Sequence, residues 1–358
     1  MEDKNKQDFP DSKINDRFKE KIVLRLAQGE NPYQIPADLF TSDNQDVLSL
    51  HKLQALTNAV PCYTNLADID CVLYTLCLAA EAFRLRCKRI PYIAIAAKHG
   101  NPCGMAVNWE SSEKVILRAL FGNPLAVWGG EFIVNFKISE DLARLLYKSQ
   151  KRKEMFDNAY WMLDVVVAPD FDKKTIGIIG KSVSRKLLKN PELYKPKLAR
   201  LIWQYRQIRG GFLRQPPPSY MLDFTKTEGT VGQLEDKTLD SLTLAWSVVY
   251  SSNHGGNEIA LVKDNQLLGV GGGPSTIDAA KTAVSRAKDR GHDIVDSVFA
   301  ADAFFPFVDA PEVLKKAGCR YGIVPSGGKN EALAKKYFQD NNISVVYIPS
   351  QYRGFCRH

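Results

Sequence analysis

The sequence predicts an α/β fold in which short buried strands alternate with helices. Apolar runs of strand length recur along the chain, as at residues 90–97, 163–168 and 298–301. Segments with helical patterns lie between these runs, and glycine or proline marks most of the boundaries. Alternation of this kind is typical of layered α/β domains.

Length and composition predict two globular domains. The chain has 358 residues, of which 45% are hydrophobic and 25% are charged. Residues 1–18 are polar and charged, which predicts a flexible N-terminal arm. A lysine- and arginine-rich stretch at 181–218 ends in three prolines, so we expect a first domain at 19–200 and a second at 201–358.

The first half contains two loops of unusual composition, each next to an apolar run. One loop, residues 98–104, follows the strand predicted at 90–97. The other, residues 128–131, precedes a strand predicted at 132–134. Helices are expected at 68–86 and at 139–148, the second with Ser139 as its N-cap, and a strand is expected at 163–168.

The second half repeats the alternation. Asp264-Asn265 between two apolar runs predicts a β-hairpin, and three glycines at 271–273 lead into a helix that begins near Ser275. The remaining elements are expected as a helix at 239–251, strands at 298–301, 322–325 and 344–348, and a helix at 330–338.

Charge and hydropathy narrow the function classes. The net charge of +8 is compatible with nucleic acid, an anionic membrane surface or anionic small molecules. The first residues are polar rather than signal-like, and no apolar run approaches the roughly 18 residues of a membrane span. Seven scattered cysteines without a Cys-x-x-Cys pair indicate reduced thiols, so we expect a cytoplasmic protein without membrane contact.

Lys98-His99 is a candidate acid–base pair. An imidazole titrates near neutrality, and an adjacent ammonium can lower its pKa and stabilise a developing oxyanion. A surface Lys-His dipeptide is the plain alternative. Cys103 follows a proline as in zinc deaminases, but the second cysteine and the glutamate of that signature are absent, so no zinc is expected; a nucleophilic role for Cys103 stays open.

Two further segments are candidates for binding. The Gly271-Gly272-Gly273-Pro274-Ser275 turn opens a helix, where backbone amides can hold phosphate or carboxylate, although a simple helix-entry turn explains it equally well. In residues 302–309, three phenylalanines surround Pro306 between Asp302 and Asp309. Such a run could form an aromatic slot for a flat heterocycle, or it could be core.

Together these motifs resemble AICAR transformylase, the formyl-transferring part of a bifunctional purine-biosynthesis protein. The resemblance rests on residues 98–104 and 302–307, with further agreement, in order along the chain, at residues 29–34, 128–135, 168–171, 210–211 and 269–273. It extends from about residue 22 to residue 358. The other part of that protein, an IMP cyclohydrolase domain, has no room here, so a stand-alone transformylase and a separate cyclohydrolase are expected.

The resemblance implies two cytidine-deaminase-like α/β/α layered domains without zinc, and a homodimer with active sites at the subunit interface. It implies formyl transfer from 10-formyltetrahydrofolate to the 5-amine of AICAR. The implied catalytic residues are His99, which helps to deprotonate the amine, Lys98, which supports proton transfer to the leaving folate, and Asn257, which orients the formyl oxygen. Expected nucleotide-binding residues are Asn101, Gly129, Gly130, Glu131, Gly271, Gly272, Ser275 and Arg353, and expected folate-binding residues are Phe304, Pro306, Phe307 and Asp309. A potassium ion near Asp302 is also implied.

Three departures from the family pattern concern this site. Ala27 and Thr276 stand where the family has arginine, and His254-Gly255-Gly256 is an unusual stretch before Asn257. Arg353 or Arg357 could supply the missing phosphate contact. These departures favour an alternative in which a divergent relative formylates another amine or uses another formyl donor. A remote alternative, suggested by the basic stretch at 181–206, is a nucleic-acid-binding protein.

Overall fold

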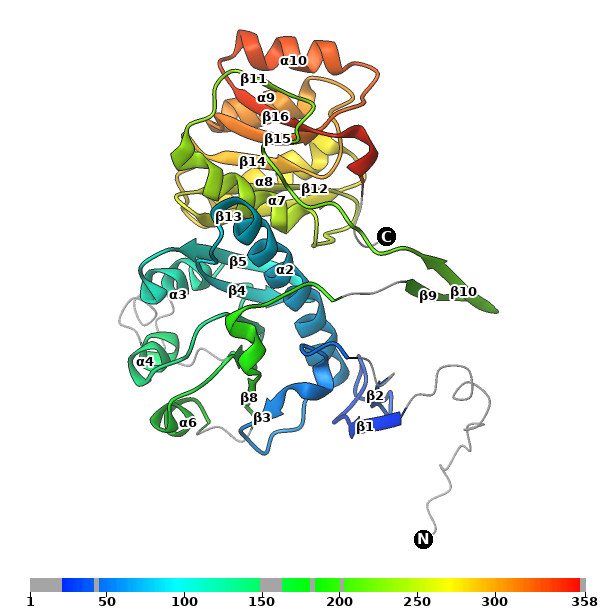
Figure 1. The fold of residues 1–358 in the computed structure, drawn as a ribbon, viewed down its shortest axis with the longest axis vertical. Helices are drawn as coiled ribbons and strands as arrows, with labels where there is room; N and C mark the ends of the chain where they lie inside the picture. Colours follow the sequence, from blue (N-terminus) through cyan, green and yellow to red (C-terminus); the bar gives the residue numbers. More distant parts are fainter. Residues whose placement is uncertain (1–20, 42–44, 149–162, 181–183, 200–202, 355–358) are drawn as a thin grey trace.

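A computed structural model describes residues 21–41, 45–148, 163–180, 184–199 and 203–354. The arm expected at residues 1–18 lies outside this part of the chain. Of the described strands, twelve form one mixed sheet, and two hairpins of two strands each stand apart from it. Figure 1 shows the sheet running through two lobes, with helices packed on its faces.

The elements keep their chain order. The sheet contains β3 (Gln54–Ala55), β4 (Tyr92–Lys98), β5 (Asn101–Asn108), β6 (Glu131–Val134), β7 (Val165–Ala168), β8 (Lys186–Lys189), β11 (Gly229–Val231), β12 (Asn257–Lys263), β13 (Gln266–Gly273), β14 (Val298–Ala301), β15 (Tyr321–Pro325) and β16 (Ser344–Ile348). The separate hairpins are β1 (Lys21–Arg25) with β2 (Asp38–Thr41), and β9 (Gln204–Ile208) with β10 (Gly211–Gln215). The helices are α2 (Tyr63–Cys87), α3 (Ser112–Leu120), α4 (Glu140–Lys148), α6 (Lys173–Ile179), α7 (Leu239–Val249), α8 (Thr276–Asp289), α9 (Asp309–Ala317) and α10 (Glu331–Asp340).

The two lobes have the same strand order. Read outward from the centre of the sheet, one lobe runs β5-β4-β6-β7-β8-β3 and the other runs β13-β12-β14-β15-β16-β11. Each begins with an antiparallel hairpin, adds a third antiparallel strand, continues with two parallel strands and ends in an antiparallel edge strand. The topology therefore repeats, although the sequence shows no repeat.

The lobes meet where β5 lies antiparallel to β13, with Gln266 opposite Ala106. Helices α2 and α7 pack against each other over one face of the sheet near this junction, and Phe83 and Trp246 are fully buried there. The opposite face is covered by α3, α4 and α6 in one lobe and by α8, α9 and α10 in the other. This gives three layers, α/β/α. Burial of apolar side chains on both faces, at about 25 cal/mol per Å², holds the layers together.

Most predicted elements are confirmed. Asp264 and Asn265 have φ values of 49° and 63° and form the expected hairpin turn between β12 and β13. Ser139 caps α4, its Oγ accepting the N–H of Leu142 at 3.3 Å. Helix α2 begins at Tyr63 instead of residue 68, because Asn65 Oδ1 accepts the N–H of Cys62 and caps an earlier turn.

The loop expected over residues 98–104 is shorter than predicted. Only His99 and Gly100 form a turn, and β5 already begins at Asn101. Pro102 fits into this strand because the pairing of β4 with β5 shifts between Ala96 and Ala97. The correction places the Lys98-His99 pair at a tight hairpin tip.

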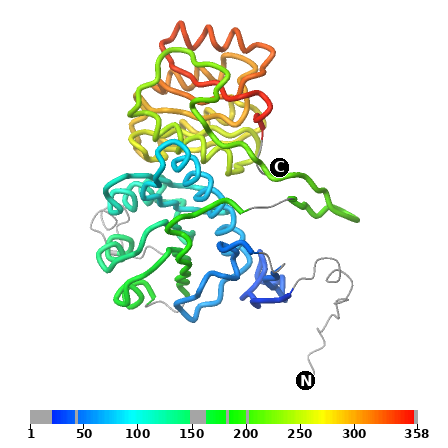
Figure 2. Tube along the Cα trace, in the orientation of Figure 1, coloured from blue at the N-terminus to red at the C-terminus, as the bar shows by residue number. Residues whose placement is uncertain are grey.

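Between the lobes the chain forms the β9–β10 hairpin, which extends away from the body of the molecule (Figure 2). Its strands carry exposed apolar side chains, including Ile208 and Leu213. Among the described residues, the longest apolar helices fall short of what crossing a lipid bilayer would require.

Candidate functional site

The Lys98-His99 pair lies at the tip of the β4–β5 hairpin. His99 has a φ of 53°, which is unusual for a residue with a side chain, and Gly100 follows with a φ of 70°. The carboxylate of Asp68, on α2, accepts the backbone N–H of His99. Asn101 Nδ2 donates to the carbonyl of His99 at 3.1 Å. The turn is therefore fixed through its backbone, while the His99 ring is exposed.

Lys98 joins this turn to the second loop singled out in the sequence. Its Nζ donates to the carbonyls of Trp128 at 3.1 Å and Gly129 at 2.8 Å. Gly130 sits so close to β4 that a Cβ would lie 2.2 Å from the carbonyl oxygen of Ala97. The two loops, distant in sequence, thus form one surface around the ammonium of Lys98.

A buried acid pair lies beneath this surface. Glu131 and Asp68 share a side-chain hydrogen bond, and Asn65 Nδ2 donates to Glu131 Oε1 at 3.0 Å. Burial, followed by the charge of Asp68, raises the pKa of Glu131 to about 8, and burial also raises the pKa of Asp68. The pair therefore holds a shared proton near neutral pH. Glu131 was expected to bind substrate; its side chain is buried and faces Asp68 and Asn65, which sequence reasoning did not single out.

A cavity of about 320 Å³ opens at the junction of the lobes, beyond the point where β5 and β13 pair. It joins Lys98, His99 and Asn101 of the first lobe to Arg286 and His254 of the second. The remaining lining residues are Pro102, Cys103, Asn123, Ala126, Leu268, Gly269 and Val270. The cavity thus collects two imidazoles and two cationic side chains. Burial raises the pKa of the Cys103 thiol to about 12, which disfavours the thiolate needed for a nucleophilic role.

His254 and Arg286 line this cavity although sequence reasoning assigned neither to the site. The ring Nδ1 of His254 lies 2.8 Å from Glu258 Oε2, and its backbone N–H donates to Glu258 Oε1. Gly272 makes this possible, because a Cβ there would lie 2.6 Å from atoms of His254. The available signal was the unusual His254-Gly255-Gly256 stretch.

Two expected nucleotide-binding residues, Ser275 and Gly271, and the expected catalytic residue Asn257 lie outside the cavity. Ser275 caps α8, its Oγ accepting the N–H of Asp278 at 3.2 Å. Gly271 packs on α8, where a Cβ would lie 2.3 Å from the nitrogen of Ala283. Asn257 Nδ2 makes a long, 3.4 Å contact with the carbonyl of Gly273. These residues border the cavity wall formed by β13 but do not line the cavity.

The phenylalanine-rich segment does not form one aromatic slot. Phe305 is 2% exposed and packs in the core, whereas Phe307 is 60% exposed. The ring of Phe304 lies 5.6 Å from the guanidinium of Arg353. Arg353 lines another cavity, of about 380 Å³, which is separate from the one at the junction. The three rings diverge because the chain turns at Pro306 just before α9.

The two acids that bracket this segment differ in their surroundings. Asp302 is buried; its Oδ1 accepts the N–H of Glu258 at 2.8 Å, and its Oδ2 has no partner among the described residues. Burial, with the charge of Glu258, raises the pKa of Asp302 to about 8. Asp309 lies at the first turn of α9, where its Oδ1 accepts the N–H of Ala310. In the part of the chain that the structure describes, His, Cys, Asp and Glu do not gather in groups of three or more that could hold a metal ion.

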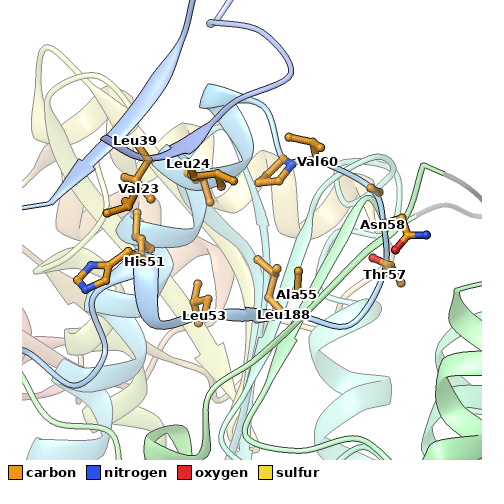
Figure 3. A pocket seen from close by; sticks show the side chains of 14 residues that line it. Val23, Leu24, Leu39, His51, Leu53, Ala55, Thr57, Asn58, Val60 and Leu188 are labelled. Atoms are coloured by element: carbon orange, nitrogen blue, oxygen red, sulfur yellow. The ribbon is translucent and has the colours of Figure 1, made fainter. Parts of the chain in front are cut away.

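A further cavity, of about 300 Å³, is apolar and lies away from all predicted site residues. Figure 3 shows Val23, Leu24 and Leu39 of the β1–β2 hairpin facing Leu53 and Leu188, with His51 at the edge. It offers few groups for chemistry. The junction cavity, which is lined by Lys98, His99, His254 and Arg286, is the candidate active site.

Comparison with known proteins identifies the family of the chain. The family model described as "AICARFT/IMPCHase bienzyme" matches residues 1–286. The "Bifunctional purine biosynthesis protein PurH" of Aquifex aeolicus is 29% identical over 334 residues, which is 91% of this chain and 58% of that protein. The protein of the same name from Thermoanaerobacter sp. is 27% identical over 355 residues, covering 96% of this chain and 61% of the relative.

The chain thus spans about three-fifths of the length of these curated relatives. A solved deaminase/reductase from Thermotoga maritima matches 27% of the chain at 18% identity, with a TM-score of 0.21. The family match covers the Lys98-His99 turn and Leu268, Gly269 and Val270 of β13, which all line the cavity. The chain belongs to the AICARFT/IMPCHase bienzyme family.

Proposed function

We propose that the protein transfers a formyl group from 10-formyltetrahydrofolate to the 5-amine of AICAR, giving FAICAR, in purine biosynthesis. The observation that carries the proposal is the junction cavity, in which a chain of this family places Lys98, His99 and Asn101 side by side. The curated relatives are named as bifunctional purine biosynthesis proteins.

In this reaction the amine nitrogen attacks the formyl carbon, and the bond from that carbon to the folate nitrogen then breaks. The amine must lose one proton and the leaving nitrogen must gain one. The exposed imidazole of His99, at the tip of its hairpin, takes the proton from the amine. Lys98, held by two carbonyls, supplies a fixed positive charge beside the oxygen of the tetrahedral intermediate, which Asn257 orients.

The positive charge for the substrate's phosphate comes from a position other than the two family arginines. Thr276 is buried at the start of α8, and Ala27 has no charge. The nearby Arg25 is paired with Asp38 at 3.1 Å. Arg286 lines the junction cavity, donates from Nη1 to the carbonyl of Val270 at 2.7 Å and has no acidic partner among the described residues, so it is the cation best placed to replace them.

We place the folate against Phe304, Pro306, Phe307 and Asp309, as the resemblance implies. The unpartnered Oδ2 of Asp302 is the oxygen that would ligate a potassium ion, since it is buried and carries no hydrogen bond among the described residues. We also propose that the two domains divide at residue 200. The folate segment then belongs to the second domain, and residues of both domains line the junction cavity.

We further propose a homodimer. The β9–β10 hairpin leaves the body of the molecule with Ile208 and Leu213 exposed, and the β1–β2 hairpin exposes Ile22 and Val23. Exposed apolar side chains on projecting hairpins are typical of surfaces that a second subunit covers.

The test is direct. Purified protein is mixed with AICAR and 10-formyltetrahydrofolate, and release of tetrahydrofolate is followed spectroscopically. Turnover that depends on both substrates is expected. Absence of turnover at high enzyme concentration would contradict the proposal.

Ala27 and Thr276 stand where the family has arginine. This difference favours a second candidate function, in which the protein formylates another amine or uses another formyl donor. A thermal-shift screen of aminoimidazole and related nucleotides separates the two. Stabilisation by AICAR above all other nucleotides supports the first candidate, and stabilisation by a different amine supports the second.

A further inference from the structure

A second imidazole faces the junction cavity and is more firmly oriented than His99. The side chain of His254 is 12% exposed, and that of its partner Glu258 is 2% exposed. Glu258 accepts the backbone N–H of His254, and Ser252 Oγ lies 3.1 Å from its Oε2. A carboxylate acts as acceptor in such a site, so the hydrogen between it and the imidazole sits on Nδ1. Proton exchange is thereby confined to Nε2.

The loop that carries His254 is built to hold this arrangement. Gly255 and Gly256 have φ values of 101° and 139°, which only glycine adopts readily. They turn the chain back so that the backbone N–H and the ring Nδ1 of His254 both reach the carboxylate of Glu258. Asn101 Oδ1 accepts the N–H of Asn253 at 2.8 Å. This bond fixes the His254 loop to the hairpin that carries His99.

Three elements that surround the cavity place charged or titratable groups near His254. Lys98 and His99 belong to the β4–β5 hairpin, Arg286 belongs to α8, and Glu258 belongs to β12 with Asp302 behind it. Lys98 already donates to two backbone carbonyls. An ammonium held in this way serves better as a fixed charge than as a proton carrier, whereas an imidazole exchanges protons near neutral pH.

We propose that His254 is the general acid of the transfer and that Glu258 is its positioning residue; this role rests on the proposed formyltransferase function. The amine forms its bond to the formyl carbon and gives its proton to His99. As the bond from that carbon to the folate nitrogen breaks, the nitrogen keeps the electron pair and takes the proton from Nε2 of imidazolium His254. One proton leaves the amine and one reaches the leaving nitrogen, so the step balances, and solvent restores both imidazoles.

Chemical rescue tests this role. His254→Gly is compared with wild type for kcat and for KM of AICAR and of 10-formyltetrahydrofolate, with and without added imidazole. The matched control is His51→Gly, which removes an imidazole at the apolar cavity. His254→Gln is the second variant. It keeps most of the side-chain volume, whereas His254→Gly also makes the loop more flexible. Melting temperature and circular dichroism show whether each variant is folded.

The expected result is a fall in kcat of about 100-fold or more in both His254 variants, with each KM within about threefold of wild type. Imidazole should restore kcat at least tenfold in His254→Gly and leave His51→Gly unchanged. Unchanged kcat in His254→Gln would contradict the role of His254 as general acid. A raised KM for AICAR at unchanged kcat would also contradict it, because His254 would then only contact the anionic substrate. If the wild-type protein shows no turnover with both substrates present, the proposed formyltransferase function itself is contradicted, and the role of His254 with it.

Discussion

The β4–β5 and β12–β13 hairpins occupy the same place in the two lobes, yet only one forms a candidate active site. Both turn over two residues with positive φ, His99-Gly100 in one and Asp264-Asn265 in the other. The second turn is closed by its neighbours: Ser241 Oγ lies 2.9 Å from the nitrogen of Asn265, and the Asn265 carbonyl accepts the N–H of Val107 at 3.1 Å.

In the first turn, Asp68 accepts the backbone N–H of His99, and Lys98 and His99 line the cavity. The shared topology therefore provides two equivalent positions. The side chains and the packing around each turn decide whether it performs chemistry or holds the lobes together.

Glycine substitution of the first residue in each turn tests this contrast, and one of the two variants should show the largest change in kcat. His99→Gly should lower kcat by about 100-fold to 10,000-fold, because it removes the base while glycine accepts the positive φ. Asp264→Gly, at the matching position, should keep kcat within about twofold. Both are measured by tetrahydrofolate release, with folate binding measured by fluorescence to show that the His99→Gly site is intact. Equal rates in the two variants would contradict the assignment of His99.

Gly272→Ala tests whether the second lobe contributes through His254. The added Cβ would meet His254 at 2.6 Å, so the loop must shift and kcat should fall by roughly tenfold or more. Gly211→Ala is the control, since no atom lies within 4 Å of a Cβ at that position. A variant at Gly272 that keeps full kcat would show that the position of His254 is unimportant.

The acid pair beneath the first turn makes stability depend on pH. The pKa of Glu131 rises from 4.5 to about 8 on folding, so the folded state binds the extra proton. Its contribution is complete below about pH 4.5 and is lost as pH rises toward 8. The free energy of unfolding should fall from pH 5 to pH 8 by about 3 to 4 kcal/mol more in wild type than in Glu131→Gln. Urea titrations across this range measure the difference, and parallel curves would contradict the shared proton.

Ser275→Ala should give the smallest effect. Loss of the cap of α8 costs about 1 kcal/mol, which a urea titration detects, while KM for AICAR stays unchanged because the hydroxyl is engaged with Asp278. A raised KM would instead support the nucleotide-binding role that the family resemblance implies for Ser275.

Local sequence patterns predicted most elements and one wall of the site. The apolar run before Lys98 and the cluster of glycines and proline after it indicated a strand end with a tight turn, and the structure has that turn. The pairing of Lys98 with the carbonyls of Trp128 and Gly129 could not be predicted, because it depends on how β4 and β6 align. The partner of Glu131, Asp68, comes from a helix more than 60 positions earlier in the chain.

By itself the sequence determined the α/β class, the family resemblance and the residue types at the tip of the β4–β5 hairpin, because strand periodicity, turn chemistry and motif spacing are local properties. Only the tertiary structure decided that twelve described strands form one sheet with a repeated order, and that His254 faces the same cavity as His99. The physical reason is that β5 and β13 meet only when both lobes have folded. Their contact brings together side chains that lie 155 positions apart in the sequence.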